Sequence, residues 1–98
     1  YYQRAVEKGL KVTGLSYKKE IAVDLTFNKE TIGKYFLDFV VEDKVVVELK
    51  AVPGLQPKDF TQVLAYLKAA NLELGILVNF RTEKLTYKRI LNSKYHSD

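Results

Sequence analysis

The chain has 98 residues, a size that suits one compact domain and is too small for two. It has no Cys and a single His, which excludes disulfides and thiolate metal sites and argues against catalysis built on His. The net charge of +4 comes from scattered lysines and is a weak indication of a polyanionic partner.

A helix is predicted at the start of the chain. Apolar residues recur at helical spacing from Tyr2 to Leu10, and Gly14 suits the end of the segment. Because the pattern is already present at the first residues, we expect the first turns of this helix to be truncated. No run approaches the roughly 18 apolar residues of a membrane span. No signal peptide is visible, so we expect a cytoplasmic location.

Three strands are predicted next. Apolar residues alternate with polar ones from Tyr17 to Phe27, which is typical of a half-buried strand. Two further strands are predicted over residues 32–41 and 45–52, with polar turns at residues 28–30 and 42–44 between them. Strands joined by such short connections predict an antiparallel meander.

A second helix and two more strands complete the prediction. Pro57 suits the first helical position and Asp59 the first turn of a helix that runs to about residue 70. Residues 72–80 are almost all apolar, as in a strand that is buried on both faces and reached through a helical crossover. A last strand is predicted from Leu85, and the polar tail over 92–98 is expected to fray.

Charged residues interrupt two of the predicted strands. Asp38 lies in one apolar run, and Glu48 and Lys50 lie in the next. Charges inside apolar strands are costly unless they are paired, hydrated at an edge or bound to a metal. Residues two apart share a face of a strand, so Glu48 and Lys50 point the same way. The opposite face, predicted to be an apolar layer, comprises Val45, Val47, Leu49 and Ala51.

The hairpin turn predicts that two carboxylates meet. Residue numbers that sum to about 86 pair across a turn centred on Asp43, which places Asp38 opposite Glu48. Adjacent carboxylates repel, and the pKa of one should rise. A Mg²⁺ or Mn²⁺ ion would relieve this conflict and activate a water against a phosphodiester, while Lys50 orients the water and offsets charge. The alternative is a structural ion pair on an edge strand.

Two residues of the second helix form a further candidate pair. Gln62 and Tyr66 are four apart and so share one helix face, which differs from the apolar face. The Gln could bind a phosphate or a metal-bound water, and the Tyr could stack on or hydrogen-bond to a substrate. The alternative is that both are ordinary surface residues.

These features together resemble the PD-(D/E)XK nuclease superfamily, and within it the small GxxExxY family. The stretches that carry the likeness are 33–41, 45–51, 62–69, 74–80 and 88–90. The resemblance implies a single restriction-endonuclease-like α/β domain over residues 1–98, with the order helix, three strands, helix, two strands and a mixed central sheet.

The resemblance also implies roles for the candidate residues. Asp38 and Glu48 correspond to the metal ligands and Lys50 to the catalytic lysine. Gln62 and Tyr66 match the Gln-x-x-x-Tyr motif of the RecB-like branch, which contributes to the active site or to nucleic-acid contact. The Glu of the GxxExxY motif would fall before residue 1, three positions ahead of Tyr2; in the superfamily a first-helix Glu often helps to bind metal.

The leading hypothesis is therefore a Mg²⁺- or Mn²⁺-dependent nuclease acting on DNA or RNA, with DNA expected. One alternative is a catalytically inactive relative that serves as a nucleic-acid-binding or protein-interaction module. The other is a structural domain with an ion pair on a strand. An exposed final strand or a truncated first helix would allow a homodimer.

Overall fold

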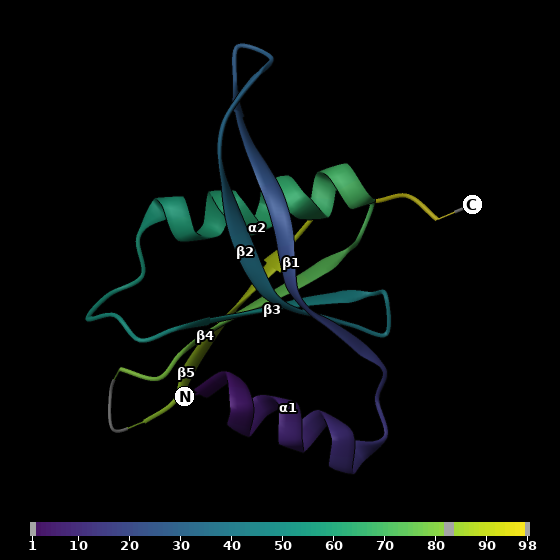
Figure 1. Ribbon diagram of the computed structural model, residues 1–98, viewed down its shortest axis with the longest axis vertical. Coiled ribbons are helices and arrows are strands. Elements are labelled where there is room, and N and C mark those ends of the chain that lie inside the picture. The colour runs from purple at the N-terminus through teal and green to yellow at the C-terminus, as the bar shows by residue number, and fades with distance from the viewer. Residues whose placement is uncertain (1, 82–83, 98) are drawn as a thin grey trace.

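The computed structural model describes residues 2–81 and 84–97, and in this part of the chain it contains two helices and five strands (Figure 1). The elements are α1 (Tyr2–Thr13), β1 (Tyr17–Phe27), β2 (Glu30–Val41), β3 (Val45–Lys50), α2 (Pro57–Ala70), β4 (Leu74–Asn79) and β5 (Thr86–Leu91). The predicted order of helix, three strands, helix and two strands is confirmed. Within the described residues, neither α1 nor α2 is long and apolar enough to cross a membrane.

The strands form one mixed sheet in the order β1-β2-β3-β4-β5. β1, β2 and β3 are joined as an antiparallel meander, and β4 lies parallel to β3 after the crossover through α2. β5 adds an antiparallel strand at the edge. α2 and α1 lie on opposite sides of the sheet, and the long β1–β2 hairpin extends past the sheet and crosses α2 (Figure 1). The predicted meander and parallel crossover are both confirmed.

Both hairpin turns have the geometry that suits the twist of adjacent strands. Asn28 and Lys29 have φ values of 50° and 65°, and Glu42 and Asp43 have values of 54° and 52°. Two consecutive residues with positive φ form a turn that matches the right-handed twist of a hairpin. Asn28 and Lys29 make up the whole loop of the first hairpin, whereas residues 42–44 form a three-residue loop in the second. The second of these turns fixes the register in which Phe39 pairs with Val47.

The main hydrophobic core lies between α2 and the sheet. Gly75 of β4 allows the close approach, because a Cβ at this position would lie 2.6 Å from Val63 Cγ1 of the helix. By contrast, no residue of α1 is fully buried. The buried cluster comprises Leu37, Val40, Val46, Val63, Leu67, Leu77 and Ile90.

The structure corrects the prediction of which face of β3 is the buried layer. Ala51 is exposed, and the odd-numbered residues of β3 are only half-buried. The face with Glu48 is the more deeply buried one, since Val46 is 0% and Glu48 4% exposed. The physical reason is that α2 packs tightly on this face while α1 covers the other face loosely.

The tail also differs from its prediction. Asn92 is buried and its amide donates to the backbone oxygens of Leu67 and Leu72, at 3.3 and 3.0 Å. Farther along, the Asn71 side-chain amide donates to His96 O at 2.9 Å. The prediction that the tail frays is therefore wrong for residues 92–96, because these contacts tie it to the end of α2; residue 98 lies outside the described residues.

Candidate active site

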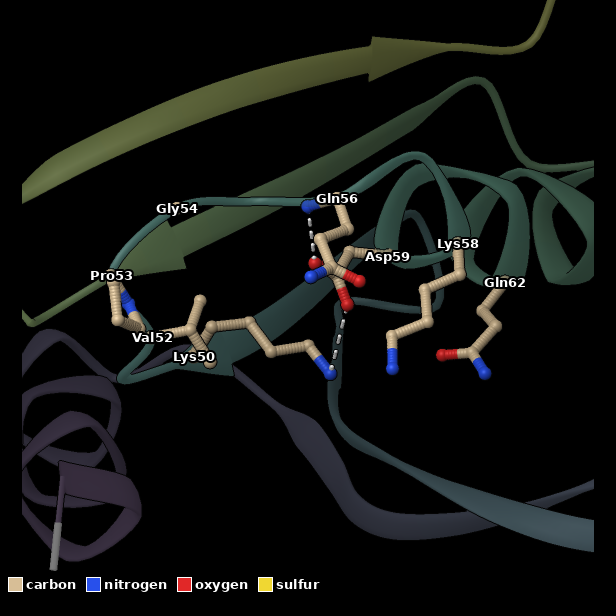
Figure 2. A pocket seen from close by; sticks show the side chains of 8 residues that line it. All are labelled: Lys50, Val52, Pro53, Gly54, Gln56, Lys58, Asp59 and Gln62. Carbon is tan, nitrogen blue, oxygen red and sulfur yellow. Dashed lines mark hydrogen bonds and ion pairs between the residues drawn. The ribbon is translucent and has the colours of Figure 1, made fainter.

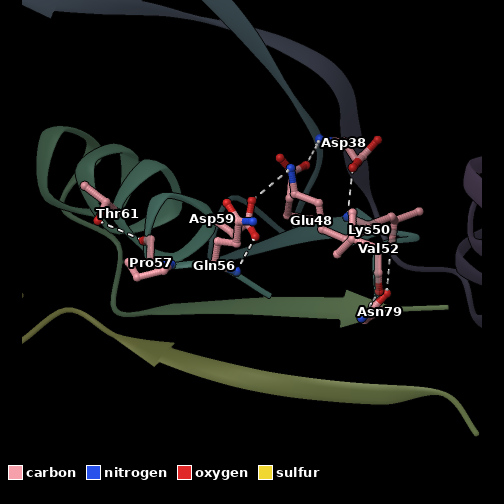
Figure 3. Close-up of polar contacts among 10 residues, drawn as sticks. Asp38, Glu48, Lys50, Val52, Gln56, Pro57, Asp59, Thr61 and Asn79 are labelled. Atoms are coloured by element: carbon pink, nitrogen blue, oxygen red, sulfur yellow. Dashed lines mark hydrogen bonds and ion pairs between the residues drawn. The ribbon is translucent and has the colours of Figure 1, made fainter. Parts of the chain in front are cut away.

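The two predicted carboxylates meet where β2 and β3 separate. The paired register ends at Phe39 and Val47. Beyond it, the Asp38 N–H donates to Glu48 Oε1 at 2.9 Å, and the Leu49 N–H donates to Asp38 Oδ2 at 2.8 Å (Figure 3). Side chains thus replace the hydrogen bonds that a continued ladder would make. The prediction that Asp38 and Glu48 are neighbours is confirmed.

Two further features hold Asp38 in place. The pairing of β1 with β2 skips Glu20, which has a φ of 54° and lies opposite Asp38. The hairpin is therefore irregular at the position of the carboxylate. From the other side of the sheet, Gln3 Nε2 of α1 donates to Asp38 Oδ1 at 3.1 Å. Both oxygens of this carboxylate therefore accept a hydrogen bond, and its orientation is fixed.

The electrostatics of the pair fit a divalent cation. Burial, together with the hydrogen bond to the Asp38 side chain, raises the pKa of Glu48 to about 8. The hydrogen bond from the Asp38 N–H and the charge of Lys50 both lower the pKa of Glu48, but they do not cancel the rise. These two closely placed carboxyl groups, one of which is kept protonated by its buried position, form an all-oxygen donor set of the kind that Mg²⁺ and Mn²⁺ prefer. Within residues 2–81 and 84–97 there is no group of three His, Cys, Asp or Glu side chains that could hold a metal.

Lys50 is tied to α2 by a carboxylate that the sequence analysis did not assign to the site. Its Nζ lies 3.7 Å from Asp59 Oδ1. Asp59 is only 6% exposed, and its Oδ2 accepts a hydrogen bond from the Gln56 N–H at 2.8 Å, as part of the capping box of α2. The Gln-x-x-Asp spacing signals a helix cap, but nothing in it signals the contact with Lys50.

A pocket of about 460 Å³ opens beside Lys50. The polar ends of Lys50, Lys58 and Gln62 are directed into the same space (Figure 2). Of the two candidate residues predicted on α2, Gln62 therefore lies at the pocket. Tyr66 is not among the residues that line it and packs against the hydrophobic core instead.

Tyr35 of β2 connects the hairpin to this helix. Its hydroxyl donates to the backbone oxygen of Gln62 at 2.6 Å. Burial raises the pKa of Tyr35, and the charges of Glu48 and Tyr66 add to the effect. Tyr35 is thus held as a neutral donor between the carboxylate pair and α2.

Asn79, at the end of β4, fixes the loop that forms the rim of the pocket. Its side chain accepts hydrogen bonds from the N–H groups of Val52 and Arg81, at 3.1 and 3.2 Å, and donates to Val52 O at 2.9 Å (Figure 3). It is 5% exposed. The only sequence signal for this role was a polar residue at the end of an otherwise apolar strand.

Comparison with known proteins defines the class of this domain. The model of the PD-(D/E)XK nuclease superfamily matches residues 1–90, and the chain therefore belongs to that superfamily. Its members are typically nucleases that act on nucleic acids with divalent metal ions, so the class indicates nuclease-type chemistry.

A solved structure supports the same fold. The protein in "Crystal structure of SSO0001" superposes with a TM-score of 0.68 at 20% sequence identity, over 93% of this chain and 49% of that chain. This chain thus spans about half the length of that protein. The likeness and the mixed sheet between two helices define a restriction-endonuclease-like fold. No curated protein matches the sequence.

Proposed function

We propose that residues 1–98 form a single nuclease domain that hydrolyses phosphodiester bonds in DNA or RNA with the help of a divalent metal ion. One observation carries the proposal. Asp38 and Glu48 meet at the point where two strands separate, with Lys50 on the same face beside an open pocket. A structural ion pair on an edge strand would not need two carboxylates in contact at a buried position.

Asp38 and Glu48 would hold the Mg²⁺ or Mn²⁺ ion. The raised pKa of Glu48 supports this, since a cation between the carboxylates would offset the burial and the neighbouring Asp38 charge that keep Glu48 protonated. When bound, such an ion would polarise the phosphate and make a coordinated water a better nucleophile near neutral pH.

The neighbouring side chains would bind and orient the substrate. The Lys50 ammonium would orient the attacking water and stabilise negative charge that develops on the phosphate. Asp59 would keep that ammonium in position. The Gln62 amide, which points into the pocket, would bind a phosphate oxygen. Tyr66 would contact the substrate only if its phenol turned away from the core, and its assignment rests on the sequence motif.

Finer assignments rest on the sequence alone. They are closeness to the GxxExxY family, DNA as the preferred substrate, a cytoplasmic location and a homodimer. We propose β5 as the strand that would pair in such a dimer, because it lies at the edge of the sheet.

A cleavage assay with matched variants tests the function. Labelled single- and double-stranded DNA and RNA are incubated with Mg²⁺, Mn²⁺ or EDTA. We expect Glu48→Gln and Lys50→Ala each to slow metal-dependent cleavage about 100-fold or more. The controls are Glu42→Gln and Lys44→Ala, the same residue types in the same spacing but in an exposed turn.

Each result has a clear meaning. Cleavage that survives both site variants would refute the assignment. Binding without cleavage in every metal would support the alternative, a catalytically inactive module that binds nucleic acid.

A further inference from the structure

A second hollow lies across a loop from the candidate active site. Its volume is about 640 Å³, and Leu55, Phe60, Leu85 and Lys88 contribute to its lining. Pro53 and Gly54 line both this hollow and the pocket beside Lys50. The two hollows therefore lie on either side of one short ridge, the loop between β3 and α2.

Both hollows carry positive charge at positions open to solvent. Lys58 lines the first and Lys88 the second, and both residues are exposed. Among the described residues that line either hollow, the only carboxylate is Asp59, which is buried and paired with Lys50. This distribution of charge is complementary to a polyanion that passes over the ridge.

The second hollow also offers apolar surface. Leu55 and Phe60 are half-buried, and Leu85 is 56% exposed. A phosphate backbone gains nothing from such a surface, whereas the flat face of a base can cover it. Bases within a duplex are stacked on one another, so a single strand can present a base face to it, whereas a duplex can do so only at its ends.

The ridge is well suited to guide a strand. Asn79 holds Val52 through two hydrogen bonds, so the start of the loop is fixed to the end of β4. A site that is already ordered loses less conformational entropy when it binds a ligand.

We propose that a single-stranded polynucleotide crosses the Pro53–Gly54 ridge, with phosphates beside Lys58 and Lys88 and a base against the apolar surface of the second hollow. The proposal rests on the proposed function in one respect. It places the strand so that the phosphate in the first pocket is the one beside Lys50, while the second hollow binds the adjoining part of the substrate.

Equilibrium binding tests the proposal without cleavage. The full chain carries Glu48→Gln, the buffer contains EDTA, and the probes are fluorescent strands of about 20 nucleotides, longer than the usual footprint of one small domain. One probe is oligodeoxythymidine, one is oligouridine and one is a DNA duplex of the same length. The two single strands distinguish DNA from RNA, and binding of either one supports the proposal.

Three further substitutions are compared in this background. Lys88→Ala should weaken single-strand binding about fivefold. It should also reduce the slope of log affinity against log salt concentration by about one, as loss of one phosphate contact predicts. Leu85→Ala should weaken it about fivefold through loss of the base contact. Lys44→Ala, the same charge change at the opposite end of β3, should leave affinity within about twofold. Since Lys88, Leu85 and Lys44 are all exposed, the variants should fold, and thermal melts check this.

Two results would overturn the proposal. One is a Lys88→Ala affinity equal to that of Lys44→Ala. The other is a duplex that binds as tightly as the single strands, with no effect of Leu85→Ala. The proposed function is tested separately, by the cleavage assay. A chain without nuclease activity can still show the binding differences predicted here, and an active nuclease can lack them.

Discussion

Ionisation of Glu48 should make the stability of this protein fall as pH rises. The side chain is 4% exposed, and burial beside Asp38 raises its pKa from 4.5 to about 8. Between these two values, the folded protein keeps a proton that the unfolded chain has released. Stability is therefore fully present below about pH 4.5 and is lost as the pH rises towards about 8.

The size of this loss follows from the same values. Each tenfold change in a protonation equilibrium is worth about 1.4 kcal/mol, so raising the pKa from 4.5 to about 8 sets an upper limit of about 5 kcal/mol. Relaxation of the site and entry of water reduce such penalties, and we expect about 2 kcal/mol. Glu48→Gln keeps an oxygen to accept the Asp38 N–H but cannot ionise, so it should be more stable than the wild type at high pH.

Urea unfolding of both proteins in EDTA, from about pH 5 to about pH 8.5, measures the effect. The Glu48→Gln protein should gain about 2 kcal/mol on the wild type across this range. The difference between the two proteins isolates Glu48, because the lowered pKa values of Glu7 and Glu42 affect both equally. An advantage that stays constant or shrinks as the pH rises would refute the reasoning.

Three other predictions concern metal binding and packing. Millimolar Mg²⁺ should raise the melting temperature of the wild type at pH 8 but not that of Glu48→Gln, and an equal rise in both would count against the site. Gln3→Ala should weaken Mg²⁺ binding about tenfold by calorimetry, because Asp38 loses the donor that orients it; unchanged affinity would show that Gln3 has no such role. Gly75→Ala should destabilise the fold by about 2 kcal/mol in urea, and adding Val63→Ala should restore part of this, since the new methyl meets Val63; strictly additive losses would contradict the predicted clash.

The meeting of Asp38 and Glu48 could be predicted from the sequence because it depends on local geometry. Side chains alternate along a strand, and a short turn, here the three residues 42–44, fixes which residues face each other. The observed pairs of Phe39 with Val47 and of Val41 with Val45 follow the predicted register. The same reasoning gave the parallel crossover, since a nearly unbroken apolar strand after a helix is typical of that arrangement.

The supporting contacts of the site could not be predicted in this way. Gln3 reaches Asp38 across 35 positions of sequence, and Asn79 reaches Val52 across 27. No spacing rule connects such residues. The separation of Gln62 from Tyr66 also shows the limit, because residues four apart share a helix face only approximately, and one lines the pocket while the other packs on the core.

The sequence by itself determined the strands, the two tight turns and the placing of two carboxylates side by side. The tertiary structure alone decided which face of β3 would be buried, and hence that Glu48 would have a pKa of about 8 rather than that of a solvated carboxylate. The physical reason is that periodicity and turn geometry are properties of neighbouring residues, whereas burial depends on where α2 packs. That position is allowed by the close packing of Val63 against Gly75, two residues that only the folded chain brings together.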